Sequence, residues 1–252
     1  MRLTMVFVRW SLLGLMTGGA AFAGLTEGLP SKIQAPPSLA PRADRAAFMQ
    51  QHFVSVTNVH DAVIRGDLKI ARAEARAIAS RPAPPGLPEA AGPYLAVMQL
   101  SAGRAAADED LEDVAAFTAS MLATCGDCHR AVGTMPAVAP PASSAVGGMV
   151  GHMLAHKVAA DLMAQGLTVP STSAWDEGVR QLRSAPLRRG ALPKDPKLTK
   201  DILDNEKRVH SLAERGLEAS DARSRIYVYS ELLQSCASCH ALHGNVWGPT
   251  KR

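Results

Sequence analysis

Two five-residue motifs contain every cysteine of the chain: Cys125-Gly126-Asp127-Cys128-His129 and Cys236-Ala237-Ser238-Cys239-His240. Cys-x-x-Cys-His is the pattern at which haem c is attached, with the two thiols forming thioethers and the adjacent histidine ligating the iron. Two copies with no cysteine left over predict two haem c groups. The predicted covalent residues are Cys125, Cys128, Cys236 and Cys239, and the predicted proximal iron ligands are His129 and His240.

A thioredoxin-type redox pair, a zinc site and structural disulfides are the alternatives for these cysteines. A redox pair would need a βαβ context, and the sequence shows none. Four cysteines could bind one zinc ion, but a zinc site does not require a histidine directly after each second cysteine. Disulfides suit an exported chain, yet a Cys-x-x-Cys pair on a helix is usually too constrained to serve as a structural staple.

The first residues are predicted to form a secretory signal peptide, 1–23. Arg2 and Arg9 give a basic start, an apolar stretch follows, and Ala21-Phe22-Ala23 fits a cleavage site. An uncleaved anchor is the alternative, but the apolar stretch is short for a membrane span. We therefore expect a periplasmic protein cleaved after Ala23, with no stable membrane span after cleavage.

Composition narrows the class of protein further. The chain has 252 residues, of which only 4% are aromatic, and it is rich in residues that favour helices. Its formal net charge is +4, and loss of Arg2 and Arg9 with the signal peptide would leave about +2. A charge this small, without a clustered basic face, gives no support to nucleic-acid binding.

The chain uses one unit twice. Residues 49–53 (MQQHF) match residues 149–153 (MVGHM), and residues 122–125 (LATC) match residues 233–236 (LQSC). Each unit therefore runs from a Met-x-x-His segment to a Cys-x-x-Cys-His motif. The predicted parts after the signal peptide are a flexible tail (24–42), a first haem c domain (43–133), a Pro-rich linker (134–148) and a second haem c domain (149–252).

Apolar spacing and capping residues predict four helices in each half and no strand. In the first half, a helix over 43–65 ends at Gly66, Asp67 caps the second helix, and Asp108 or Asp110 begins the fourth. The last helix of the second half is expected over 221–240. The predicted fold class is all-α: two tandem four-helix bundles, each with a haem motif at the end of its last helix.

Motif placement resembles that of the class II c-type cytochromes, the cytochrome c-prime family. Only twelve residues follow His240, and none is methionine, so any sixth ligand of the second haem must come from upstream. The resemblance covers both halves and implies a four-helix bundle with the motif near the end of helix four. It also implies that the sixth-ligand side of each haem faces helix one.

The resemblance gives two candidates for the distal iron ligand in each half. They are His52 and His152, with Met49 and Met149 as alternatives at the same helical face. An open, five-coordinate iron is the third possibility.

These features predict an electron carrier between periplasmic redox proteins, not an enzyme. The alternative is a five-coordinate haem protein that binds nitric oxide or another small gas. A peroxidase is less favoured, because it needs a distal acid-base group. The sequence places no arginine or carboxylate partner beside His52 and His152 in both halves.

Overall fold

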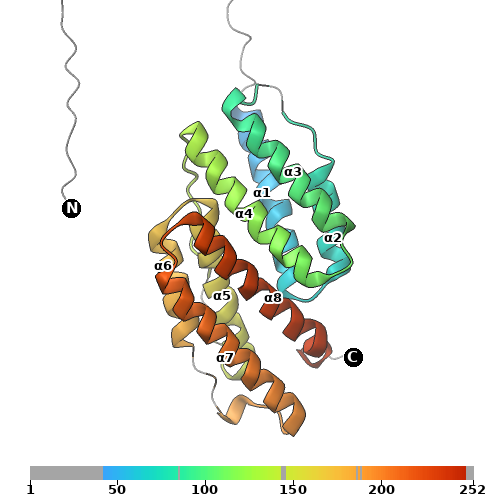
Figure 1. The fold of residues 1–252 in the computed structure, drawn as a ribbon, viewed down its shortest axis with the longest axis vertical. Helices are drawn as coiled ribbons and strands as arrows, with labels where there is room; N and C mark the ends of the chain where they lie inside the picture. Colours follow the sequence, from blue (N-terminus) through green and yellow to red (C-terminus); the bar gives the residue numbers. More distant parts are fainter. Residues whose placement is uncertain (1–41, 85, 143–145, 186, 188, 248–252) are drawn as a thin grey trace, which may run out of the picture. The chain divides into compact units, whose positions relative to one another are not determined.

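The computed structural model describes residues 42–84, 86–142, 146–185, 187 and 189–247, all within one compact unit over 37–252. The described residues are helical and include no strand, so the predicted all-α class is confirmed (Figure 1). The predicted signal peptide and all but the last residue of the predicted tail lie outside the described residues. The helices are α1 (Arg42–Ile64), α2 (Leu68–Ala79), α3 (Gly92–Ala107), α4 (Leu111–Val132), α5 (Gly148–Thr168), α6 (Thr172–Ser184), α7 (Pro196–Glu218) and α8 (Ala222–Trp247), with short 3-10 turns η1 (Glu89–Ala91) and η2 (Arg189–Ala191).

Neighbouring helices in the sequence pack against each other. In the first half, α1 packs on α2, α2 on α3 and α3 on α4, and α4 also contacts α1; α5 to α8 repeat this order. The two sets meet along α4 and α8, which lie side by side (Figure 1). In addition, α1 contacts α8 and α5 contacts α4. The first helix of each set therefore lies against the last helix of the other.

Local capping explains where several helices begin. At the start of α2, the Asp67 side chain accepts a hydrogen bond of 3.0 Å from the backbone N–H of Ile70, as predicted. At the start of α4, Asp110 accepts one of 2.7 Å from Glu112, which assigns this cap to Asp110 rather than Asp108. Each such cap stabilises a helix by about 1 kcal/mol.

The last helix is longer than the sequence predicted. α8 continues to Trp247 instead of ending near His240. The residues that follow the motif, Ala-Leu-His, include no glycine or proline to end a helix. By contrast, Gly133 follows α4 with a φ of 66°, in the left-handed region where glycine commonly ends helices.

A polar network lies between the two halves. The Lys157 ammonium is 3.0 Å from an Asp61 oxygen and 2.6 Å from an Asp161 oxygen. His60 Nδ1 lies 3.2 Å from Asp61, and its Nε2 lies 2.6 Å from the hydroxyl of Tyr229, which is fully buried. Residues of α1, α5 and α8 therefore share one set of polar contacts.

Tyr229 connects this network to α5. Its hydroxyl donates to the Ala160 carbonyl at 2.9 Å and lies 2.6 Å from His60 Nε2. The other ring nitrogen of His60 faces the Asp61 carboxylate, which can only accept, so His60 carries a proton on Nδ1. The Lys157 ammonium lies between Asp61 and Asp161, the carboxylates of opposite halves.

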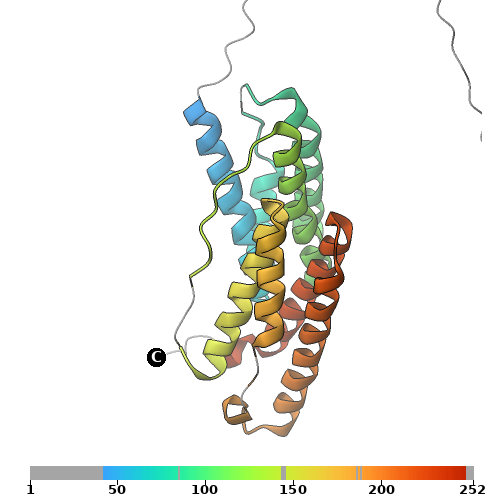
Figure 2. The ribbon, with the colours of Figure 1, turned by 90° about the vertical axis from the view of Figure 1, so that its left-hand side faces the viewer.

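The described part of the linker covers the contact between α1 and α5. Gln165 of α5 donates a 3.0 Å hydrogen bond to the Val138 carbonyl of the linker. A cavity of about 220 Å³ lies beneath it, lined by residues of both helices and of the linker, among them Phe53, Val138 and Asp161. Figure 2 shows the segment running along the outside of the helices from the end of α4 toward the start of α5.

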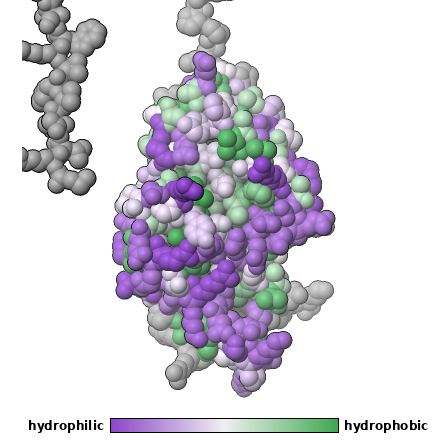
Figure 3. Space-filling view, viewed as in Figure 1, coloured by the Kyte–Doolittle hydropathy of each residue, from purple (hydrophilic) through white to green (hydrophobic). Residues whose placement is uncertain are grey.

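One face of the described residues is largely polar. The face seen in Figure 3 is mostly hydrophilic, with small and scattered hydrophobic areas. Among the described residues, no helix combines the length and the apolar character needed to span a bilayer.

Candidate functional site

Both cysteine motifs lie on the helices at the junction of the two halves, the first on α4 and the second on α8. On a helix, the two cysteines and the histidine occupy positions i, i+3 and i+4, so the three side chains project from one side. Cys125 and Cys236 pack against the hydrophobic core. None of the four thiols forms a disulfide. Each motif therefore presents two free thiols and an imidazole together.

Burial makes the first thiol of each motif a weak acid. It raises the pKa of Cys125 and of Cys236 to about 12, and the second thiol of the same motif adds to the effect. Thiol–disulfide exchange requires a thiolate, and redox-active Cys-x-x-Cys pairs have lowered pKa values. The environment of both motifs is thus the opposite of that in a thioredoxin-type site.

The two motif histidines make equivalent contacts across the junction. His129 Nδ1 lies 2.8 Å from the carbonyl oxygen of Thr168, at the end of α5. His240 Nδ1 bonds in the same way to the carbonyl oxygen of Ile64, at the end of α1. A carbonyl can only accept, so each Nδ1 carries a proton, and in the neutral ring the lone pair is then on Nε2. This is the arrangement in which proteins hold a metal-ligating histidine.

Small residues allow these close approaches. A Cβ on Gly126 would overlap the carbonyl oxygen of Leu167, and a Cβ on Gly66 would lie 2.7 Å from the backbone nitrogen of Ala241. Gly66 also has a φ of 73°, which suits glycine. The end of α5 thus rests on the first motif, and the end of α1 rests on the second.

His52, the distal candidate of the first half, is buried on α1. Its ring stacks on Phe48 with centroids 5.6 Å apart, and its Nδ1 has no hydrogen-bond partner. Burial and the nearby positive charge of Arg81 lower the pKa of His52 to about 4. Arg81 donates a 2.9 Å hydrogen bond to Ser55, one turn along α1. His52 is therefore a neutral imidazole with an unused nitrogen beside a cation.

His152, the distal candidate of the second half, is also buried but has a different partner. Its Nε2 lies 3.0 Å from an oxygen of Glu206, on α7. The same carboxylate lies 3.8 Å from His156 Nε2 and 3.1 Å from His210 Nε2. Burial lowers the pKa of His156 to about 4, although the Glu206 charge opposes this shift. The second half thus has three imidazoles around one carboxylate.

This group of side chains lies close to the second motif. Charges of Asp201 and Glu206 act on the thiol of Cys239, which Asn205 also hydrogen-bonds. The charge of His240 is among those that act on His156. Residues of α5 and α7 therefore surround the end of α8 that carries the motif.

The methionine alternatives differ between the halves. Met149 is 6% exposed, whereas the side chain at the equivalent position, Met49, is 37% exposed. An interior iron ligand must point into the helix packing. Met149 meets this requirement better than Met49.

Four neighbours of the candidate histidines were not predicted from the sequence: Arg81, His156, Glu206 and His210. The pairs His152/His156 and Glu206/His210 are both spaced i, i+4, a signal that each pair shares a helix face. Sequence spacing could not reveal that the two faces meet. A charged partner does lie beside each candidate histidine, an arginine in one half and a carboxylate in the other.

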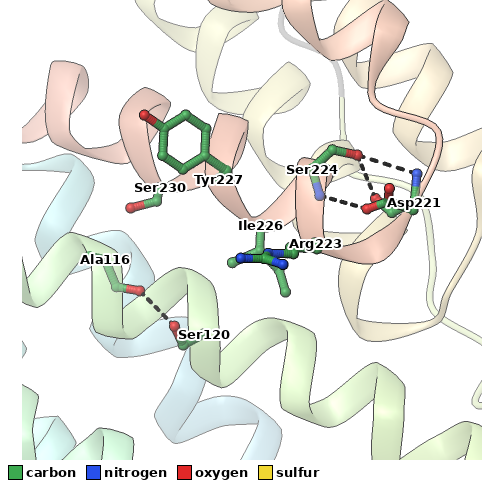
Figure 4. A pocket seen from close by; sticks show the side chains of 8 residues that line it. All are labelled: Ala116, Ser120, Asp221, Arg223, Ser224, Ile226, Tyr227 and Ser230. Atoms are coloured by element: carbon green, nitrogen blue, oxygen red, sulfur yellow. Dashed lines mark hydrogen bonds between the residues drawn. The ribbon is translucent and has the colours of Figure 1, made fainter.

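A cavity of about 510 Å³ opens between α4 and the start of α8 (Figure 4). Its lining includes no residue of the motifs and none of the candidate histidines. Its polar groups serve the helix: Asp221 accepts from the backbone of Ser224 at 2.8 Å, and the Ser224 hydroxyl accepts from the backbone of Asp221 at 3.3 Å. The cavity therefore shows no sign of being a functional site, and the motifs remain the candidate site.

The side chains at both motifs fit covalently bound haem. Each motif offers two free thiols and an imidazole whose Nδ1 is held by a carbonyl, and the buried Nδ1 of His52 has no partner. In the described residues, the two groups of side chains that could hold a metal ion are His152/His156/Glu206 and His60/Asp61/Asp161. Neither includes a cysteine, which does not favour a cysteine-based zinc site. Comparison with known proteins found no matching family model, no similar curated protein and no similar solved structure.

Proposed function

We propose that this protein is an exported di-haem cytochrome c that carries single electrons between periplasmic redox proteins and has no substrate chemistry of its own. The observation that carries the proposal is the matched pair of hydrogen bonds from His129 and His240 to backbone carbonyls. Both bonds leave Nε2 free beside two unpaired thiols. A disulfide gives no reason for this arrangement to recur at both motifs.

In the proposed protein, α1–α4 and α5–α8 are tandem four-helix bundles of the kind found in class II c-type cytochromes. Cys125 and Cys128 hold one haem, with His129 as the proximal ligand. Cys236 and Cys239 hold the other, with His240. The haem supplies a reversible one-electron change at its iron. The helices orient the imidazoles and hold Cys125 and Cys236 against the hydrophobic core.

His52 and His152 are the proposed distal ligands. Both are buried on the first helix of their half, and the unpartnered nitrogen of His52 is the expected state of a ligand without its metal. Met49 and Met149 are the alternatives, and burial favours Met149 over Met49. Two six-coordinate irons would transfer electrons without binding exogenous ligands.

Haem content tests the proposal directly. The full chain, expressed in a host that exports it and attaches haem c, is expected to carry two covalent haems and to begin at Gly24 by mass spectrometry. The double variant Cys125→Ser/Cys128→Ser is expected to lose one haem, halving the haem absorbance per protein. Cys236→Ser/Cys239→Ser should do the same. A wild-type protein without covalent haem would refute the function.

The distal assignment predicts the spin state. Replacement of His52 or His152 by alanine should convert the matching haem from low spin to high spin, seen in the optical spectrum. Carbon monoxide should leave the reduced wild-type spectrum unchanged and should bind to the variants. Prompt binding by the wild type would instead support the alternative, a haem protein that takes up nitric oxide or another small gas.

A further inference from the structure

The two halves place opposite charges beside equivalent histidines. His52 and His152 occupy matching positions of the repeat, one turn before Ser55 and Ala155. The charge that acts on His52 is the guanidinium of Arg81. The group bonded to His152 is the carboxylate of Glu206, at 3.0 Å. The two halves therefore repeat the same helices but differ in the charge beside the candidate histidine.

The carboxylate of the second half is well placed to act on a haem held there. The Glu206 side chain is only 13% exposed, so solvent screens it weakly. It contacts His152 on α5, and its charge reaches the motif thiol of Cys239. Asp201, on the same helix, adds a second negative charge near Cys239.

The first half has no carboxylate in the corresponding helix. The sequence of α3, GPYLAVMQLSAGRAAA, contains neither aspartate nor glutamate, whereas α7 contains five acidic residues. On the α1 side, Arg81 is tied to Ser55 by a 2.9 Å hydrogen bond, which keeps the cation near His52. The difference between the halves is thus fixed by side chains that have defined contacts.

We propose that Glu206 and Arg81 make the two haem sites unequal, so that the second haem has the lower midpoint potential and the first haem the higher one. This inference rests on the proposed function. The oxidised iron centre carries one more positive charge than the reduced one. A nearby carboxylate therefore stabilises the oxidised state and lowers the potential, whereas a nearby cation has the opposite effect. A carboxylate that accepts a hydrogen bond from a ligand imidazole also raises the basicity of that ligand.

The difference in midpoint potential sets the direction in which an electron moves between the two haems. One electron added by a chemical reductant to the fully oxidised protein rests on the first haem, and the second haem is reduced only at lower potential. A redox partner that donates at the second haem would thus pass its electron downhill to the first. The protein would favour transfer from a donor at the second haem to an acceptor at the first, rather than act as two equal carriers.

A spectroelectrochemical titration of the purified di-haem protein tests this ordering. The wild type is expected to show two separate one-electron steps. Glu206→Gln keeps the size of the side chain and removes its charge, and it should raise the lower step while leaving the higher step in place. Arg81→Gln should lower the higher step alone, and Arg81→Lys, which keeps the charge, should restore it. Glu214→Gln is the control, because Glu214 lies on the same helix in an exposed pair with Arg183.

Several results would overturn the inference. A wild type whose haems titrate as one step, a Glu206→Gln protein with unchanged potentials, or a shift of the higher step by that variant would each contradict it. The Arg81 variants give an independent measurement if Glu206→Gln does not fold. Failure of the proposed function is a separate outcome, because it would appear earlier, as a protein without covalent haem.

Discussion

Replacement of Gly126 by alanine is expected to lower the free energy of unfolding by roughly 1–3 kcal/mol. The added Cβ would overlap the carbonyl oxygen of Leu167 and lie 3.2 Å from the side chain of Pro170. Backbone cannot move aside as a flexible side chain can, so α4 must shift away from the end of α5. The shift would also lengthen the bond between His129 and the Thr168 carbonyl.

Helix propensity alone would predict the opposite change, a higher free energy of unfolding. Alanine in a helix interior is favoured over glycine by about 1 kcal/mol. Gly103 supplies the matched control, since it lies inside α3 and a Cβ there would meet nothing within 4 Å. Gly103→Ala should therefore stabilise the protein, and Gly126→Ala should destabilise it, with a melting temperature roughly 4–8 °C lower for a loss near 2 kcal/mol.

Thermal and urea unfolding of the three proteins measure these effects. Equal stabilisation by both substitutions would show that α5 does not rest on the first motif. Because Gly126 occupies a variable position of the Cys-x-x-Cys-His motif, where the second motif has Ala237, the variant should also retain both haems. Loss of the first haem by Gly126→Ala would indicate that the position acts on attachment itself rather than on the contact between helices.

The sequence was sufficient to predict those features of the fold that depend on residues close together in the chain. Asp67 and Gly66 lie at a helix boundary because a cap and a left-handed glycine act within one turn of chain. The motif helices follow from apolar spacing in the same way. The predicted end of α8 was wrong for a related reason: the prediction ended the helix at the motif, although the three residues that follow His240 include no glycine or proline.

Contacts between the halves could not be predicted, because they join residues far apart in the chain. His240 bonds to the carbonyl of Ile64 across 176 positions, and neither residue carries a local signal for the other. Glu206 and His152 belong to the same half, but they lie 54 positions apart on different helices, so their contact was not predictable either. His60 has no counterpart in the second half. Its contact with Tyr229, which joins α1 to α8, is known only from the structure.

Replacement of Lys157 by methionine is expected to destabilise the protein by roughly 1–3 kcal/mol at neutral pH. Lys157 lies between Asp61 and Asp161, and its removal leaves two carboxylates of opposite halves facing each other. Loss of one partner from a fully buried ion pair costs about 3–5 kcal/mol, and the partial exposure of these side chains reduces that value.

The loss should depend on pH in a defined direction. Burial alone would raise the pKa of Asp61, but hydrogen bonds from His60 and Lys157 and their positive charges lower it from 3.8 to about 2. A carboxyl whose pKa falls on folding contributes stability above its unfolded value, and this contribution is lost as the pH falls through the folded value. The difference between wild type and Lys157→Met should therefore be largest above pH 4 and should shrink toward pH 2.

An exposed pair of the same type supplies the control. Lys200 and Asp204 are also spaced i, i+4 and lie 2.6 Å apart, as Lys157 and Asp161 do, but they are largely exposed. Lys200→Met should leave the stability almost unchanged at every pH, because solvent screens such a pair. Urea unfolding at a series of pH values compares the two variants. Equal and pH-independent effects would mean that the network between α1, α5 and α8 does not hold the halves together.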